Sequence, residues 1–318
     1  MKTITILVPT YNEQDNVTPL SEAIIKEFEE FLPHYNYEIV FIDNYSQDNT
    51  RTRLTALCEK NKKIKAIFNC KNFGQFNSPF YGMTQINSDC VILMCADFQD
   101  PIDMIHKFVA EWENGYKIVI GIKTKSKESK IMYLMRLLYY KTIKKISRID
   151  HIENFTGFGL YDKAFIEVLR QIKDPLPYLR GIVAELGFER KEIPYTQQKR
   201  LHGKTSNNWF TLYDVGMLGI TSYSKTLMRL ATISGFCISM ISFIIGIVYL
   251  VLKLLNWDDF SAGTAPTLIG MFFMGAIILF FIGILGEYIL NINIRQMNRP
   301  LVIEDKRLNF EENDNDKA

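Results

Sequence analysis

The chain has 318 residues, of which 47% are hydrophobic and 23% are charged, so its composition is that of a folded protein of about two domains. Its 37 Lys and Arg against 35 Asp and Glu give a net charge of +2, which excludes a dedicated nucleic-acid binder because such proteins need a large basic excess. The five cysteines include no C-x-x-C pair, so we expect reduced thiols in a cytosol-facing protein and neither a disulfide framework nor a zinc site.

Strand-like and helix-like segments alternate through residues 1–225, which we expect to form one α/β domain. The expected strands are residues 3–9, 37–42, 64–69, 90–95 and 117–121, and the expected helices are residues 17–31, 48–60, 77–87 and 101–113. This alternation predicts a mainly parallel sheet covered on both faces, with ligands bound beyond the carboxyl ends of the strands. Neither G-x-G-x-x-G nor a P-loop occurs, so dinucleotide and P-loop functions lack their signatures.

Polar clusters follow three of the expected strands. They lie at residues 10–13, 43–46 and 96–100. Asp97 leaves a buried apolar strand and is a natural ligand for Mg²⁺ or Mn²⁺, since hard cations prefer carboxylate oxygens and also bind diphosphates. Asp100 stands directly before Pro101 and fits the N-cap of the next helix.

Two further carboxylates fit a nucleotide site. Asp43 closes the second strand and can accept hydrogen bonds from a nucleobase or ribose, and Glu13 can hold a nucleotide in the same way. The alternatives are that Ser46 or Asp48 only caps the following helix, and that Glu13 is a surface loop carboxylate.

Basic residues in the later part of the domain are candidates for binding phosphate. Arg side chains offer a bidentate fork to phosphate oxygens, although each such residue alone is more often a solvated surface charge. Residues 199–206, KRLHGKTS, suggest a mobile loop that closes over phosphate. The candidates are Lys123, Arg136, Arg180, Arg200 and Lys204.

Two long uncharged runs predict membrane spans. Residues 231–252 and 261–286 contain no charged side chain, and each run exceeds the roughly 20 residues that cross a bilayer. We expect transmembrane helices at 230–256 and 261–290, with two buried core helices as the alternative. Lys and Arg flank the pair on its outer sides, so the positive-inside rule places both termini in the cytoplasm.

Three other segments carry expectations. Residues 131–147 lie within a stretch, 123–148, that has nine Lys or Arg and one Glu, which is typical of a helix lying in the lipid headgroup plane. Residues 209–227 mix aromatic and aliphatic side chains. For this segment, as for residues 131–147, the two interpretations are an interfacial helix and a core-facing amphipathic helix. Residues 304–318 are acidic and polar and are expected to be a disordered tail.

These motifs together resemble the family-2 glycosyltransferases, specifically the polyprenyl-phosphate branch of dolichyl-phosphate mannose synthase and the bactoprenol glucosyltransferases. The resemblance extends to about Ile303. The matching segments are residues 8–13 (VPTYNE), 42–50 (IDNYSQDNT), 72–74 (NFG), 96–101 (ADFQDP) and 180–181 (RG), then Arg200, Gly203, Lys204 and the helix pair that ends in Arg299 and Pro300.

The resemblance implies a GT-A fold, which is Rossmann-like and has a mainly parallel sheet. It also implies an enzyme that transfers sugar, with inversion, from a nucleotide-sugar donor to undecaprenyl phosphate or a similar lipid phosphate. A UDP-sugar is the favoured donor. It further implies a bacterial cytoplasmic membrane protein of cell-envelope glycan synthesis, and the glycine-rich spans suggest a homo-oligomer. The implied nucleotide-sugar site consists of Pro9, Tyr11, Glu13 and Asp43, and the implied ligands for Mg²⁺ or Mn²⁺ are Asp97 and Gln99. The implied catalytic residues are Asp97, Arg136, Arg200 and Lys204. The implied ligands of the acceptor phosphate are Lys123, Arg136, Arg200 and Lys204.

The chain departs from the family pattern in three places. Asn44 stands where the family often has a second aspartate, Cys95 stands where the Asp-x-Asp metal motif has its first, and residues 154–160 lack an acidic residue. A lipid phosphate needs no base, because it is already anionic. The rival functions are a polysaccharide-elongating transferase of the same fold, a catalytically impaired membrane scaffold, and a small transporter or flippase.

Overall fold

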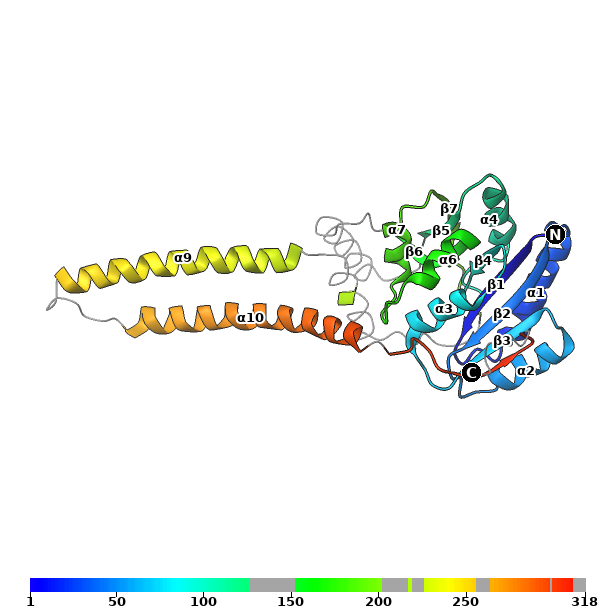
Figure 1. Ribbon diagram of the computed structural model, residues 1–318, viewed down its shortest axis with the longest axis horizontal. Helices are drawn as coiled ribbons and strands as arrows, with labels where there is room; N and C mark the ends of the chain where they lie inside the picture. Colours follow the sequence, from blue (N-terminus) through cyan, green and yellow to red (C-terminus); the bar gives the residue numbers. More distant parts are fainter. Residues whose placement is uncertain (126–151, 202–216, 219–225, 256–263, 298, 311–318) are drawn as a thin grey trace.

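The computed structural model describes residues 1–125, 152–201, 217–218, 226–255, 264–297 and 299–310. These residues form an α/β domain built on one sheet, from which two long helices extend side by side (Figure 1). The eight strands lie in the order β7-β5-β6-β4-β1-β2-β3-β8. Their bounds are β1 Thr3–Thr10, β2 Asn36–Asp43, β3 Ile64–Asn69, β4 Cys90–Leu93, β5 Ile118–Lys125, β6 Phe155–Asp162, β7 Arg190–Thr196 and β8 Glu304–Leu308.

The sheet is mainly parallel, as the sequence predicts. Strands β1 to β4 pair in parallel, and β5 pairs in parallel with β7. Only β6 and β8 run against their neighbours, so six of the eight strands share one direction and end at one edge. The described part of the chain therefore has the mainly parallel, GT-A-like α/β architecture that the resemblance implies, with the carboxyl ends of β1, β2, β3, β4, β5 and β7 along one side.

Helices cover both faces of the sheet. Helices α1, α2 and α4 pack on one face and α3, α6 and α7 on the other. Their bounds are α1 Val17–Phe31, α2 Thr50–Lys60, α3 Gly74–Gln85, α4 Met104–Glu113, α6 Lys163–Gln171 and α7 Leu179–Glu185. In α1 the buried residues Leu20, Ile24 and Phe28 recur at helical spacing, while Ile6 and Leu7 of β1 enter opposite layers because strand side chains alternate.

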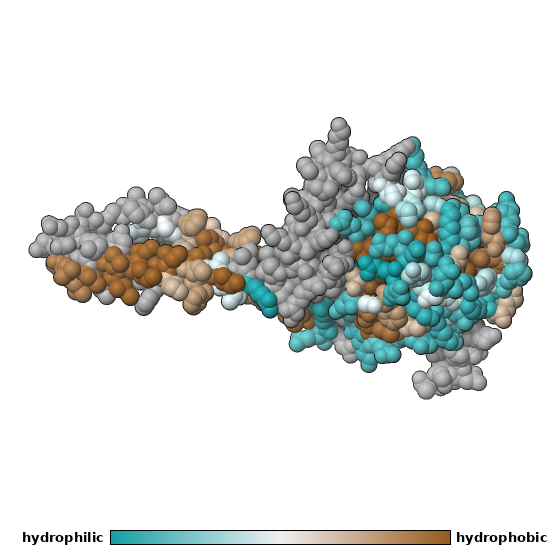
Figure 2. Space-filling view, turned by 90° about the horizontal axis from the view of Figure 1, so that it is seen from above, coloured by the Kyte–Doolittle hydropathy of each residue, from teal (hydrophilic) through white to brown (hydrophobic). Residues whose placement is uncertain are grey.

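The long helices α9, Thr226–Leu255, and α10, Thr264–Gln296, present apolar side chains to solvent. Figure 2 shows this apolar surface on the extension beside a mostly hydrophilic domain. Within the described residues, one segment, Phe273–Gln296, is long and apolar enough to cross a membrane. The second expected span, at 230–256, stays a prediction. The expected helix at 131–147 and most of the segment 209–227 lie outside the described residues.

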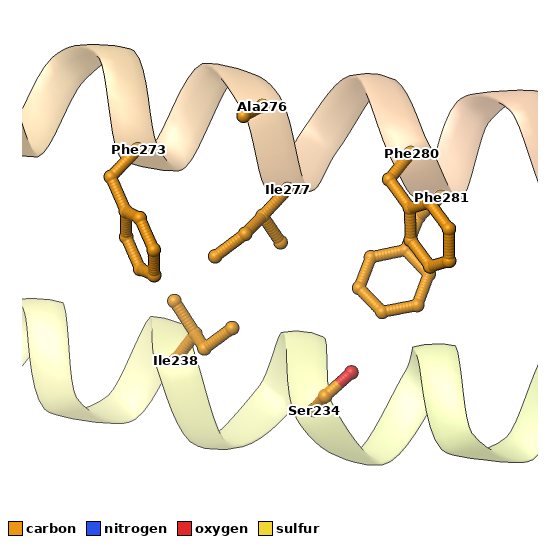
Figure 3. A pocket seen from close by; sticks show the side chains of 7 residues that line it. All are labelled: Ser234, Ile238, Phe273, Ala276, Ile277, Phe280 and Phe281. Atoms are coloured by element: carbon orange, nitrogen blue, oxygen red, sulfur yellow. The ribbon is translucent and has the colours of Figure 1, made fainter.

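A hollow lies between α9 and α10. Its volume is about 380 Å³, and Figure 3 shows Phe273 and Ile277 of α10 pointing toward Ile238 of α9. Its lining is almost entirely apolar: Ser234, Ile238, Phe273, Ala276, Ile277, Phe280 and Phe281. The hollow therefore holds none of the polar residues that the sequence analysis selects.

The expectation of a disordered tail from residue 304 is wrong for its first residues. Strand β8 pairs antiparallel with β3, where Phe68 faces Lys306. The side chain of Asn309 also donates hydrogen bonds to the carbonyls of Cys58 and Ile64, both at 2.7 Å. The polar composition of this segment misleads because it forms an edge strand, whose backbone pairing needs few buried side chains.

Candidate functional site

Two loops at the carboxyl ends of β1 and β2 are bound to each other by hydrogen bonds. The amide of Asn12 donates to Ser46 Oγ at 2.8 Å, and the amide of Gln47 donates back to Asn12 Oδ1 at 2.8 Å. The amide of Glu13 donates to Thr50 Oγ1 at 2.9 Å. Because Thr10 and Asp43 are register partners, the two loops leave the sheet side by side.

Backbone strain marks the same edge of the sheet. Three non-glycine residues have positive φ in the loops after β1, β2 and β4: Asn12 at 57°, Tyr45 at 69° and Phe98 at 59°. Such a conformation costs free energy in a residue with a side chain, and it concentrates at functional sites. The strain therefore lies next to the carboxylates that the sequence selects, Glu13, Asp43 and Asp97.

Asp97 is buried and forms an ion pair with Arg200. Arg200 Nη2 lies 2.8 Å from Asp97 Oδ2, and the amide of Gln99 donates to Asp97 Oδ1 at 3.1 Å. The chain after β7 reaches this position because the amide of Gln198 donates to the carbonyl of Gln99 at 3.2 Å. Two predicted site residues, Asp97 and Arg200, thus meet across 103 positions of sequence.

Glu13 belongs to the same electrostatic cluster. Burial raises the pKa of Glu13, the hydrogen bond from Asn16 opposes that rise, and the charge of Asp97 adds to it while that of Arg200 lowers it. The Asn16 amide donates to Glu13 Oε2 at 2.5 Å. Glu13, Asp97 and Arg200 therefore lie within electrostatic range of one another.

Asp43 is fully buried at the end of β2. Its Oδ2 accepts from Arg51 Nε at 2.7 Å and from the amide of Ser46 at 3.1 Å. Its Oδ1 is buried and has no hydrogen-bond partner among the described residues. A buried acceptor without a partner is costly, so this oxygen is suited to a donor group from a ligand.

The expectation that Asp100 caps a helix is wrong. Helix α4 begins at Met104, and Asp100 instead accepts from the amide of Cys95 at 2.9 Å and from Tyr195 Oη at 3.2 Å. Desolvation raises the pKa of Asp100 to about 6, and the nearby charge of Asp97 adds to the rise. Asp100 therefore fixes the loop after β4 and does not begin the helix.

Asp100 should make stability depend on pH. The folded pKa of about 6 lies above the usual 3.8, so this group contributes full stability below about pH 4, and the contribution is lost as pH rises through about 6. Asp100→Asn should remove this loss. The melting temperature of Asp100→Asn minus that of the native protein should therefore increase from pH 4 to pH 7. The exposed carboxylate variant Asp103→Asn is the control, and a difference that stays flat with pH for Asp100→Asn contradicts the assignment.

Asn44, one of the departures from the family pattern, is a hydrogen-bond hub. Its amide group donates to Asn72 Oδ1 at 2.9 Å and to the carbonyl of Gly74 at 3.2 Å. Its carbonyl oxygen accepts from the amide of Phe73 at 2.9 Å and from Asn69 Nδ2 at 3.1 Å. A carboxylate cannot donate, so an aspartate here would lose half of these contacts.

Asn44→Asp should therefore destabilise this chain, although it restores the residue common in the family. Two donated hydrogen bonds are replaced by repulsion between acceptors, at a cost of about 1–3 kcal/mol. We expect a lower melting temperature in thermal unfolding. Asn36→Asp is the matched control, because that amide donates only one long bond, 3.4 Å, to Thr3. Equal melting temperatures for the two variants would refute the role of Asn44.

Few protein ligands are available for a metal ion. Among the described residues no group of three or more His, Cys, Asp or Glu side chains is arranged to hold one. Asp97 and Gln99 supply oxygen ligands of the kind that Mg²⁺ and Mn²⁺ accept, with the remaining positions left to diphosphate and water. Cys95 is exposed, and its soft sulfur is a poor ligand for these hard cations.

The other predicted residues are placed less tightly. Pro9 and Tyr11 flank the end of β1, and Tyr11 is exposed. Lys123 lies near the carboxyl end of β5, where its amide donates to the carbonyl of Asn154 at 3.2 Å. Arg180 is close enough to Cys95 for its charge to lower the thiol pKa, against the larger opposing effects. Arg136 and Lys204 lie outside the described residues.

Two functional-site residues were not predicted from the sequence, Arg51 and Tyr195. Arg51 is the second residue of α2 and reaches back to Asp43. Tyr195 lies on β7 and bonds Asp100 across 95 positions of sequence. For Arg51, the sequence shows only that a cation follows the polar cluster at residues 43–46, in the first turn of the next helix. For Tyr195 no local signal exists.

Comparison with known proteins identifies the family. The profile of glycosyl transferase family 2 matches residues 5–170, more than half of the chain, so the chain belongs to this family and is a glycosyltransferase. The matched residues include Glu13, Asp43 and Asp97, and they end within α6.

Similarity to curated relatives extends along nearly the whole chain. The putative glycosyltransferase CsbB of Bacillus subtilis is 30% identical over 93% of this chain and 89% of its own length. The SfII prophage-derived bactoprenol glucosyl transferase of Shigella flexneri is 29% identical over 95% of this chain and 97% of its own length. A crystal structure of S. aureus TarS 1-349 in complex with UDP-GlcNAc has a TM-score of 0.44 and 15% identity, over 70% of this chain and 67% of that chain.

Proposed function

We propose that this glycosyltransferase transfers a sugar, with inversion, from a nucleotide-sugar donor to a polyprenyl phosphate such as undecaprenyl phosphate, for cell-surface glycans. The observation that carries the proposal is the convergence of Glu13, Asp97 and Arg200 at the carboxyl edge of the sheet, in a chain with an exposed apolar helix. Similarity over nearly the full length to bactoprenol glucosyl transferases supports the acceptor. A UDP-sugar is the favoured donor.

The nucleoside half of the donor binds beside Pro9, Tyr11, Glu13 and Asp43. The free Asp43 Oδ1 accepts a hydrogen bond from the base or ribose, because its other oxygen is occupied by Arg51 and Ser46. Exposed Tyr11, directly after β1, offers an aromatic face to the nucleoside.

Asp97, with Gln99, would hold Mg²⁺ or Mn²⁺ against the diphosphate. When bound, the ion neutralises the leaving nucleoside diphosphate and fixes its orientation. Arg200, which lies 2.8 Å from Asp97, is placed to donate hydrogen bonds to an anionic oxygen of the donor or the acceptor.

The acceptor phosphate attacks directly. One of its oxygens forms a bond to the anomeric carbon while the bond between that carbon and the diphosphate oxygen breaks, and the nucleoside diphosphate departs with the electron pair. No proton is transferred, since the attacking group is already anionic, and no catalytic base is needed. Lys123 and Arg200, with Arg136 and Lys204, are the proposed phosphate ligands, so positioning and charge neutralisation provide the acceleration.

The sheet limits which membrane topologies the two long helices can have. Because β1 and β8 belong to one sheet, the chain before α9 and the chain after α10 lie on one side, so both helices cross or neither does. The exposed apolar surface of the pair supports crossing. We propose that the domain and both termini lie on the cytoplasmic side of a bacterial cytoplasmic membrane, because Lys and Arg flank the helix pair on its outer sides, and that the protein is a homo-oligomer.

The test is a product assay with purified full-length protein. UDP-, GDP- and CMP-sugars are each incubated with undecaprenyl phosphate and a divalent cation, and the lipid product is weighed by mass spectrometry. We expect one class of donor to give lipid phosphate enlarged by one sugar, and undecaprenol without phosphate to give none. Sugar transfer to a growing glycan but not to the lipid phosphate would establish the elongating alternative instead.

A further inference from the structure

The C-terminal strand β8 contacts Arg51, a hydrogen-bond partner of Asp43, although it follows the long helix α10 in the chain. It pairs with β3, and the amide of Cys70 donates to the carbonyl of Ile303 at 3.0 Å just before the strand. The family profile ends at residue 170, so this strand lies outside the segment that defines the family. Figure 1 shows this C-terminal segment, in red, beside β3 and near α2.

Arg51 connects this strand to Asp43. Its Nε donates to Asp43 Oδ2 at 2.7 Å, and its Nη1 donates to Asp305 Oδ2 on β8 at 3.1 Å. Its Nη2 donates to the carbonyl of Asn69, the last residue of β3. Because a guanidinium is a rigid plane, holding both Nη atoms fixes the direction of Nε.

Aromatic rings restrict Arg51 further. The guanidinium carbon lies 5.3 Å from the centroid of the Phe68 ring and 5.4 Å from that of Tyr45. Tyr45 is one of the strained residues of the site, and Phe68 is fully buried. The orientation of Arg51 is thus set by β3, β8 and the loop after β2 together.

The orientation of Arg51 matters because it sets the direction of the Asp43 carboxylate. Arg51 and the amide of Ser46 both bind Oδ2, which leaves Oδ1 as the atom offered to a ligand. If the Arg51 guanidinium could rotate, it would be able to bind Oδ1 as well as Oδ2 of Asp43. The Asp43 carboxylate would then have no single orientation, and Oδ1 would not be presented to the ligand in one direction.

We propose that Asp305 and Arg51 are positioning residues of the donor site, so that the strand following α10 is a working part of nucleotide recognition. This proposal rests on the proposed function, in which Asp43 Oδ1 meets the nucleoside. It gives β8 a role beyond covering the edge of the sheet.

Other contacts of β8 allow the positioning role to be separated from a structural one. Arg307 Nη2 donates to Gln85 Oε1 at 2.6 Å, and Asn309 donates to two backbone carbonyls. These contacts, together with the strand pairing, hold β8 when Asp305 is changed. Arg307→Gln weakens the attachment of β8 without touching Arg51, so it is the matched control.

The experiment compares Asp305→Ala, Asp305→Glu, Arg51→Lys and Arg307→Gln in full-length protein. Affinity for nucleoside diphosphate is measured by calorimetry, together with donor KM, kcat and melting temperature. Since Asp305 is half exposed, we expect Asp305→Ala to raise donor KM about threefold to fivefold with kcat nearly unchanged. Asp305→Glu should restore much of the affinity, and Arg51→Lys, which cannot reach three acceptors, should raise KM more than about tenfold.

Arg307→Gln should lower the melting temperature and leave donor KM unchanged. A donor KM within twofold of native for Asp305→Ala overturns the inference, and so does an equal rise for Arg307→Gln. If the native protein binds no UDP, GDP or CMP, the proposed function fails and the inference fails with it. Normal native binding with an unaffected Asp305→Ala variant refutes the inference alone.

Discussion

Asp97→Asn should reduce sugar transfer by about 10²–10³-fold, with the loss mainly in kcat. The substitution keeps the shape and the acceptor for the Gln99 amide but removes the negative charge that faces Arg200 and the proposed metal. In the proposed mechanism Asp97 would hold the ion and the ion would neutralise the diphosphate, so loss of the carboxylate would weaken both interactions. The rate of formation of the glycosylated lipid, followed by mass spectrometry, measures the effect.

Substitution of Arg200 tests whether Asp97 acts directly in sugar transfer or only orients Arg200. In a double-mutant cycle with Asp97→Asn, Arg200→Ala and the double variant, direct roles for both residues predict that the double variant is slower than either single one. Asp103→Asn, an exposed carboxylate paired with Lys107, should transfer sugar at the native rate. Undiminished transfer by Asp97→Asn would refute its assignment.

Local sequence was sufficient for the first half of the sheet. The expected bounds of α1 and β3 agree with the structure because their apolar residues recur at the spacing of a helix and of a buried strand. The three polar clusters also lie where parallel strands end. These features depend on neighbours in sequence, which a single sequence displays.

Contacts between distant segments were not accessible in the same way. Helix α4 begins at Met104 and not at residue 101, because Asp100 is bound by Cys95 and by Tyr195 from β7. The carboxylate therefore serves a partner 95 positions away, which no local pattern reveals. Arg200 was predicted to bind phosphate, and its pairing with Asp97 requires the path of the chain after β7.

The departures from the family pattern become intelligible through contacts. Asn44 donates hydrogen bonds that a second aspartate could not, so it fastens the loop before α3. The segment 154–160, which lacks a carboxylate, forms most of β6 between β4 and β5. Its two glycines have different structural reasons: Gly159 allows the backbone of β5 to approach closely, and Gly157 has a positive φ of 105°.

Gly159→Ala should prevent stable folding or lower the melting temperature by about 10 °C. Gly159 lies in β6 opposite Leu93 of β4 and Ile120 of β5. A Cβ at this position would lie 2.6 Å from the carbonyl oxygen of Val119 and 3.1 Å from the Cα of Ile120. Since both are backbone atoms in the middle of a sheet, the strands must separate, at a cost of about 3 kcal/mol or more.

Gly82→Ala is the matched control, because a Cβ there meets only the side-chain ends of Leu7 and Ile42, the nearest at 3.0 Å. Those methyl groups can shift, and alanine favours the helix α3, so the melting temperature should stay within a few degrees of native. Because β4 leads directly into the loop that holds Asp97, any Gly159→Ala protein that does fold should also lose transfer activity. A native-like melting temperature for Gly159→Ala would mean that the backbones of β5 and β6 leave room for a Cβ, which contradicts the 2.6 Å distance from that Cβ to the Val119 carbonyl oxygen.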